Sequence, residues 1–213
     1  MHIDVFSDVV CPWCYIGERR LAAGLAQRPG LRATRSWRPF QLQPEMPAEG
    51  IPWAEMVRGK FGGPERAAAM FRQVSAAGAP DGIRFEWERV ATAPNTVDAH
   101  RLVLWAAERG REWEMAGALF GAYFTEGRDL GSADDLAAAA ARAGLDPEEA
   151  RAFLAGDGGR DEVRRSQEEA RSLGISGVPF FVIDGRWAIS GAQPVETFLR
   201  AFDEVAAGAG DAP

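Results

Sequence analysis

Strand patterns occur only near the two ends of this 213-residue chain, and this constrains the fold more than any other feature. Residues 2–6 and 31–40 alternate apolar and polar side chains, and residues 180–183 and 187–189 are rich in aromatic and branched residues. Both patterns are typical of strands, whereas residues 53–173 have helical spacing almost throughout. We therefore expect one sheet built from both ends of the chain, with the helical middle inserted between its halves.

The N-terminal pattern predicts a strand, a helix over residues 15–27 and a second strand. Such a unit joins parallel strands through a right-handed crossover. Pro39 near the end of the second strand indicates an edge position. At the other end, Asp184-Gly185 predicts a tight hairpin turn, and residues 194–207 predict a closing helix. We predict an α/β protein with a thioredoxin-like fold interrupted by an all-helical insertion domain.

The boundaries of the two predicted domains follow from where the helical spacing begins and ends. The thioredoxin-like domain comprises residues 1–45 and 175–213, and the helical insertion comprises residues 46–174. Ser132 is a predicted N-cap, and the tail from Gly208 is predicted to fray. Helices are expected at residues 53–61, 64–77, 95–109, 113–126, 132–143, 147–155 and 160–173.

The only two cysteines form the motif Cys11-Pro12-Trp13-Cys14, where the first strand meets the first helix. A helix N-terminus carries unpaired N–H groups and a partial positive charge, so it stabilises a thiolate, which is the reactive form of cysteine. We expect Cys11 to be the nucleophile with a lowered pKa. Cys14, one turn further into the helix, is expected to resolve the mixed disulfide, and Pro12 suits the first helical turn.

Composition excludes several other classes of function. The formal charge is −7 and the pI is about 5.0, which disfavours nucleic acid and anionic membrane surfaces as partners. The first strand begins directly after Met1, and no segment has the ~18 apolar residues of a membrane helix, so we expect a cytoplasmic protein without membrane attachment. A lone cysteine pair in a reducing compartment indicates redox catalysis rather than a structural disulfide.

A metal site is not expected, because its four ligands would have to be both cysteines and both histidines. His2 begins the strand that leads to Cys11, about 20 Å away at ~3.3 Å per residue. One metal ion cannot reach all four side chains.

Val178-Pro179, directly before the predicted hairpin, is the second expected part of the site. In the thioredoxin arrangement a cis proline at this position faces the cysteine pair. Pro179 has no N–H, and we expect it to splay the chain so that the backbone of Val178 can pair with an extended substrate.

Four segments together resemble the DsbA-like thioredoxin superfamily, specifically its cytosolic FrnE-like group: residues 8–17, 37–42, 95–102 and 177–182. The resemblance implies a thioredoxin fold with a helical insertion and thiol-disulfide oxidase or isomerase activity on protein thiols and disulfides. Some relatives have further cysteines near the C-terminus. This chain has none, which excludes a second internal pair.

The resemblance also affects three individual residues. Strong oxidants of the DsbA class have histidine at the position of Trp13, so we expect Trp13 to give a less oxidising couple. Asn95 fits a helix N-cap and His100 fits a buried structural histidine. The resemblance keeps open a second interpretation, in which Asn95 and His100 face the cysteine pair.

Two other functions remain alternatives to the oxidoreductase. One is glutathione-dependent transfer or isomerisation, as in kappa-class transferases, although these typically have serine near the position of Cys11. They also tend to have an acidic residue in the loop corresponding to residues 190–193, which has none here. The other is a peptide-binding chaperone module. No cofactor is expected beyond the redox-active disulfide, and glutathione is a candidate electron partner.

Overall fold

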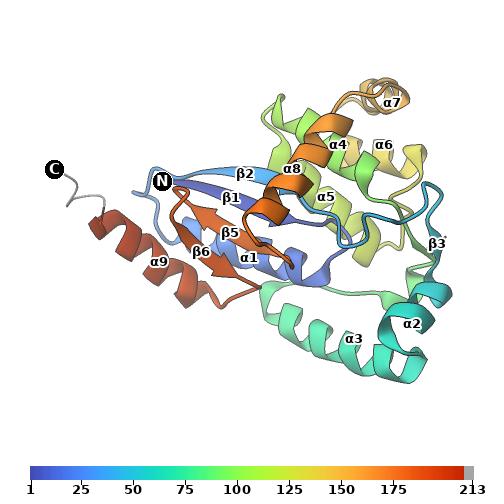
Figure 1. The fold of residues 1–213 in the computed structure, drawn as a ribbon, viewed down its shortest axis with the longest axis horizontal. Helices are drawn as coiled ribbons and strands as arrows, with labels where there is room; N and C mark the ends of the chain where they lie inside the picture. Colours follow the sequence, from blue (N-terminus) through green and yellow to red (C-terminus); the bar gives the residue numbers. More distant parts are fainter. Residues whose placement is uncertain (209–213) are drawn as a thin grey trace.

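A computed structural model describes residues 1–208 and contains one four-stranded sheet in the order β2-β1-β5-β6 (Figure 1). β1 and β2 are parallel, β5 is antiparallel to β1, and β6 is antiparallel to β5. β2 therefore lies at an edge, as Pro39 predicted. The elements that form this half of the fold are β1 (His2–Ser7), α1 (Pro12–Ala26), β2 (Thr34–Pro39), β5 (Phe180–Ile183), β6 (Trp187–Ser190) and α9 (Val195–Gly208).

The hairpin between β5 and β6 has the turn that its sequence predicts. Asp184 and Gly185 both have positive φ angles, 49° and 66°, and the N–H of Arg186 donates to the carbonyl oxygen of Ile183. Positive φ at both central positions is the geometry of hairpin turns that match the twist of the strands.

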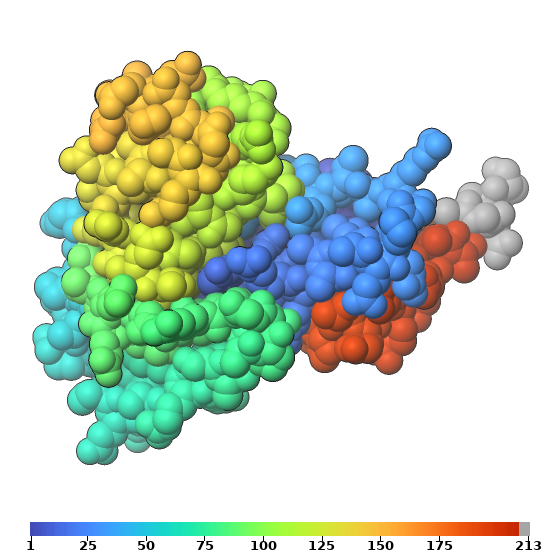
Figure 2. Space-filling view, turned by 180° about the vertical axis from the view of Figure 1, so that it is seen from behind, coloured from blue at the N-terminus to red at the C-terminus, as the bar shows by residue number. Residues whose placement is uncertain are grey.

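The middle of the chain is helical close to the predicted boundaries. Its helices are α2 (Trp53–Phe61), α3 (Pro64–Gly78), α4 (Val97–Ala107), α5 (Glu112–Phe124), α6 (Ala133–Arg142), α7 (Pro147–Ala155) and α8 (Arg160–Ser172). Ser132 accepts a hydrogen bond from the N–H of Asp135 at 3.4 Å, which confirms the predicted N-cap of α6. Figure 2 shows these helices gathered at one end of the molecule and α9 at the other.

Two details differ from the sequence expectation. The insertion is not helical throughout, because β3 (Ile51–Pro52) pairs with β4 (Thr92–Ala93) in a short antiparallel ladder. Pairs of this length leave no periodic pattern in the sequence. α8 also packs both on β2 of the sheet and against α4 of the insertion, so the boundary at residue 174 stays a prediction. The predicted fraying concerns residues beyond 208, outside the described part of the chain.

The sheet has a covered face on each side (Figure 1). On one face, apolar side chains of α1 and α9, including Leu21, Phe198 and Phe202, pack on Ile3 and Phe181. The opposite face is covered by α8, with residues of the following loop. This alternation along β1 follows from the period of two in a strand.

The largest core lies between the sheet and the inserted helices, and both cysteines belong to it. Val9 and Tyr15 from the N-terminal unit pack there with Leu119 and Phe120 of α5. Among residues 1–208, no helix combines the length and the apolar character needed to cross a bilayer. The cysteine pair is thus placed where the two parts of the chain meet.

Candidate active site

Cys11 is the N-cap residue of α1, and Pro12 occupies the first helical position. The N–H of Cys14 donates to the carbonyl oxygen of Cys11 at 3.0 Å, so the two residues lie one turn apart. Both side chains are free thiols. The local sequence produces this geometry because proline needs no hydrogen-bond partner at the first position and has the φ angle of a helix.

The two thiols differ in access. Cys11 is 4% exposed and lines a cavity, whereas Cys14 is 1% exposed and lies behind it. Burial raises the pKa of Cys14 well above its ordinary value, and the neighbouring Cys11 raises it further, against smaller opposing effects of Ser7 and the backbone of Asp8. The buried thiol therefore stays protonated until its surroundings change.

The bond between Val178 and Pro179 is cis, as expected, and Val178 lies beside the Cys11 thiol. The Cys11 Sγ atom is 3.6 Å from the carbonyl oxygen of Val178, to which the thiol donates. The N–H of Gly191 donates to the carbonyl oxygen of Pro179 at 2.8 Å, which ties this turn to the end of β6. Residues 167 positions apart in the chain thus form one site.

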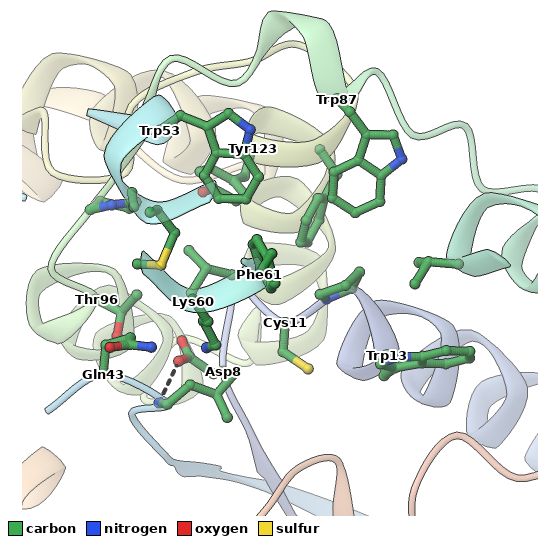
Figure 3. Close-up of a pocket in the computed structure, with 18 of the residues that line it drawn as sticks. Asp8, Cys11, Trp13, Gln43, Trp53, Lys60, Phe61, Trp87, Thr96 and Tyr123 are labelled. Carbon is green, nitrogen blue, oxygen red and sulfur yellow. Dashed lines mark hydrogen bonds between the residues drawn. The ribbon is translucent and has the colours of Figure 1, made fainter. Parts of the chain in front are cut away.

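The cavity beside Cys11 has a volume of about 280 Å³, and α2 and α3 supply most of its far wall. Its lining is mainly apolar, contains seven aromatic residues, and includes Trp13 from within the cysteine motif. Figure 3 shows Cys11 between Trp13 on one side and Asp8 and Lys60 on the other, with aromatic rings of the insertion above them. Lys60, the only lysine in the chain, lines the same cavity.

Asp8 is a site residue that sequence reasoning did not identify. It is 1% exposed, lines the cavity, and accepts a hydrogen bond from the N–H of Leu42 at 2.8 Å. Its Oδ1 atom faces His100 Nε2 at 3.4 Å. The sequence signal that could have identified Asp8 is its position: a carboxylate three residues before Cys11, directly after a largely apolar strand.

His100 is a buried histidine behind the site rather than part of the cavity wall. Its side chain is fully buried, and its Nδ1 atom accepts a hydrogen bond from Trp37 Nε1 at 3.2 Å. Since an indole N–H only donates, Nδ1 carries no proton and the proton of the neutral ring lies on Nε2, towards Asp8. His100 is not among the residues that line the cavity, and its Nε2 atom faces Asp8, which is one of them.

Asn95 does not line the cavity either. Its Nδ2 atom donates to the carbonyl oxygen of Met46 at 2.7 Å, and its Oδ1 atom accepts from the N–H of Val97 at 3.0 Å. The side chain thus pairs with the first N–H of α4, but the N-cap residue of that helix is Thr96. The predicted N-cap at Asn95 is therefore wrong by one residue, and the helix begins two residues later than predicted. Asn95 also holds the loop that brings Met46 to the cavity.

In the described part of the chain, no three histidine, cysteine, aspartate or glutamate side chains lie close enough together to hold a metal ion. His2 instead contacts Thr34 and Asp4 at the start of β1.

Comparisons with known proteins agree with this architecture. A model of the DSBA-like thioredoxin domain family matches residues 2–203. A probable DsbA oxidoreductase from Streptomyces coelicolor has a TM-score of 0.89 at 35% identity, with 100% of this chain and 92% of that chain covered. The cytosolic disulfide reductase DsbM from Pseudomonas aeruginosa, in its structure with GSH, has a TM-score of 0.65 at 22% identity, with coverage of 97% and 98%.

A curated relative from Bacillus subtilis (strain 168), the uncharacterised protein YwbO, is 26% identical over 205 residues, which cover 96% of each chain. The similarity therefore extends through the inserted helices as well as the sheet.

Proposed function

The chain belongs to the DSBA-like thioredoxin domain family, and from this premise we propose that it is a thiol-disulfide oxidoreductase or disulfide isomerase acting on protein thiols. The observation that carries the proposal is the unequal placement of its two thiols. Cys11 lies at a helix N-terminus on the wall of an open cavity, and Cys14 is buried one turn behind it. This is the arrangement that nucleophilic attack followed by intramolecular resolution requires.

The first step uses the thiolate of Cys11. It attacks one sulfur of a substrate disulfide, forms a mixed disulfide and expels the other substrate sulfur as a thiolate. The N-terminus of α1 favours the negative charge on Cys11 before the attack. The carbonyl oxygen of Val178 and the ring of Pro179 form the opposite side, along which the substrate backbone lies in this proposal.

The second step uses Cys14. Once Cys11 is part of a disulfide, its contribution to raising the pKa of Cys14 is lost, and the Cys14 thiol gives up its proton more readily. The Cys14 thiolate then attacks the Sγ atom of Cys11, which forms the internal disulfide and releases the substrate as a thiol. Two electrons have passed from the cysteine pair to the substrate.

The internal disulfide needs a thiol reductant before the next cycle, and we propose glutathione for this role. The proposal includes a cytoplasmic location, where the glutathione pool is reducing and keeps a moderately oxidising pair as the dithiol. Trp13, at the position where strong oxidants have histidine, supports a moderately oxidising Cys11–Cys14 pair. The reduction potential of the Cys11–Cys14 pair, measured in glutathione redox buffers, tests this direction of transfer.

Replacement of each cysteine tests the proposed mechanism. Cys11→Ser should abolish insulin reduction, because no attacking thiolate remains. Cys14→Ser should instead accumulate a mixed disulfide with substrate, visible as an adduct on non-reducing gels and by mass spectrometry. Gln73→Ser, on the exposed face of α3, is the matched control and should behave like the unmodified protein. Retained turnover in Cys11→Ser would refute the proposal.

Glutathione-dependent transfer or isomerisation is a second candidate, favoured by the open cavity beside Cys11, which leaves room for a small second substrate. It requires glutathione to bind without forming a disulfide. Micromolar binding to Cys11→Ser by calorimetry would support it over the first proposal. A chaperone module predicts instead that a variant lacking both cysteines still suppresses aggregation of an unfolded protein.

A further inference from the structure

We infer that Arg20 is a positioning residue for the thiol-disulfide reaction, because its guanidinium fixes the cis-proline turn relative to α1 and to the inserted helix α3. The inference rests on the proposed function, since it concerns the backbone of Val178 along which the substrate lies in that proposal. It extends the proposal by assigning a role in the reaction to a side chain outside the cysteine motif.

The guanidinium of Arg20 uses all three of its nitrogen atoms as hydrogen-bond donors. Arg20 lies on α1, and its side chain is 17% exposed. Nε donates to Asp81 Oδ2 at 2.8 Å. Nη1 donates to the carbonyl oxygen of Ala192 at 2.8 Å, and Nη2 donates to that of Ala77 at 2.9 Å. A planar guanidinium presents its donors in fixed directions, so these three acceptors are held in one arrangement.

The acceptor Ala192 connects Arg20 to the cis-proline turn. Ala192 belongs to the loop between β6 and α9, and its neighbour Gly191 donates its N–H to the carbonyl oxygen of Pro179 at 2.8 Å. The φ angle of Gly191 is 79°, a left-handed conformation that favours glycine. Two adjacent residues of this loop therefore bond to different partners, one to Arg20 and the other to the turn.

The turn held in this way carries the backbone beside the nucleophile. Val178 directly precedes Pro179, and its carbonyl oxygen lies 3.6 Å from Cys11 Sγ. Cys11 is the N-cap of α1, whereas Arg20 lies further along the same helix. α1 thus contacts the turn at its own start through Cys11 and a second time through Arg20 and the loop. Loss of the second attachment leaves the distance between Val178 and the thiol less closely fixed.

The other two acceptors connect the same guanidinium to the insertion. Ala77 lies in the last turn of α3, and Asp81 lies in the short 3-10 helix that follows. The last carbonyl groups of a helix have no partner within it, so a cation is favourable there. A Cβ atom at Gly78 would lie 3.3 Å from Cγ1 of Ile16, so this end of α3 packs tightly on α1. Figure 1 shows the end of α3 next to the loop that follows β6.

The pairing with Asp81 keeps the guanidinium in its position. The two side chains are 17% and 15% exposed, so both are largely shielded from water. Charge-assisted hydrogen bonds of this kind are stronger than those between neutral groups. One side chain therefore couples the inserted helix and the cis-proline turn, so that neither moves independently of the helix that carries Cys11.

Two disulfide substrates separate positioning from general stability. One is a peptide disulfide, whose backbone can pair with Val178, and the other is hydroxyethyl disulfide, which has no peptide group. We expect Arg20→Met to lower kcat/KM for the peptide by about tenfold and to leave kcat/KM for hydroxyethyl disulfide within about twofold, because only the peptide depends on the place of Val178. A merely structural role would lower both values in parallel.

The outcomes distinguish this inference from the proposed function. A parallel fall in both values, or a fall in neither, would overturn the role of Arg20 while leaving the proposed function intact. If the unmodified protein reduces neither disulfide, the proposed function fails, and the inference fails with it.

Two further variants complete the experiment. Arg28→Met is the matched control: Arg28 follows α1 and donates to both carboxylate oxygens of Asp203 in α9, at 3.1 and 2.8 Å. This variant should keep the ratio of the two kcat/KM values, and a fall equal to that in Arg20→Met would overturn the inference. Arg20→Lys retains the charge beside Asp81 with a single nitrogen, so its ratio should lie between those of Arg20→Met and the unmodified protein. If Arg20→Met does not fold, an unchanged ratio in Arg20→Lys overturns the inference.

Discussion

At the scale of single residues, Gly17 decides how closely the first helix approaches the cis proline. A Cβ atom at this position would lie 2.8 Å from Pro179 Cγ and 3.2 Å from Phe181 Cζ. Contacts this short do not occur without movement of the neighbour. The glycine thus allows α1 to pack directly beneath the turn that brings Val178 to Cys11.

Gly17→Ala should therefore move Pro179 and lower kcat/KM for insulin reduction by about tenfold, because small displacements of reacting groups are costly. Gly17→Ala should also not gain the stability that alanine normally adds over glycine in a helix. The matched control is Gly117→Ala in α5, where a Cβ atom has no neighbour within 4 Å. This variant should gain about 0.5–1 kcal/mol of stability from helix propensity, measured by urea unfolding, with normal activity. Normal activity in Gly17→Ala would contradict this role.

At the scale of elements, Arg101 joins α4 to the C-terminus of α7. Its side chain is completely buried. It donates to Asp98 Oδ1 at 2.7 Å and to the carbonyl oxygen of Gly158 at 2.6 Å. It also donates to carbonyl groups at the end of α7, those of Phe153, Leu154 and Gly156. The last carbonyl groups of a helix have no partner within it, so this guanidinium completes the hydrogen bonding of α7.

Arg101→Met should lower the free energy of unfolding by about 3 kcal/mol, because several carbonyl groups lose their donor inside the protein. Arg101→Lys retains the charge without the planar set of donors and should lose less. Urea denaturation of both variants, monitored by circular dichroism, measures the difference. A loss below about 1 kcal/mol in Arg101→Met would show that water replaces the guanidinium.

At the scale of the whole molecule, charged side chains join β2 to α1 and to the inserted helix α5. Arg35 of β2 pairs with Glu18 of α1 at 3.3 Å and lies 4.0 Å from the ring centre of Trp113 in α5. The N–H of Trp37, on the outer edge of β2, donates to Glu112 at 2.8 Å. An edge strand with a covered N–H is protected from pairing with another chain.

These contacts predict how stability depends on pH. Burial raises the pKa of Glu18 from its ordinary value of 4.5, against the opposing attraction of Arg35, and burial likewise raises the pKa of Glu112. A carboxyl group with a raised pKa binds its proton more tightly in the folded state. Its contribution to stability is therefore complete below pH 4.5 and is lost as the pH rises through the raised pKa.

Glu18→Gln removes this loss, since glutamine does not ionise. The stability of the variant relative to the unmodified protein should therefore increase as the pH rises from 4 to 7.5, measured by urea unfolding at each pH. Glu65→Gln changes an exposed glutamate on α3 and is the control for general effects of charge. A relative stability that decreases over this range would show that the attraction of Arg35 exceeds the cost of burial.

Much of this molecule follows from local sequence patterns. Strand alternation, helix caps and turn residues depend on neighbours within a few positions, so the order of elements and the ends of α6 and the β5–β6 hairpin could be predicted. The cysteine pair at a strand-helix junction and the proline before the hairpin were recognisable for the same reason. β3 and β4 were missed because two residues are too few to form a pattern.

The sequence by itself determined where the two thiols lie, since Cys11 and Cys14 are the only cysteines and occupy a helix start that their own neighbours specify. Only the tertiary structure decided what surrounds them. The aromatic cavity, the contact of His100 with Asp8 and the place of Lys60 all depend on residues distant in the chain. Their meeting is set by how the inserted helices pack on the sheet, which no local pattern encodes.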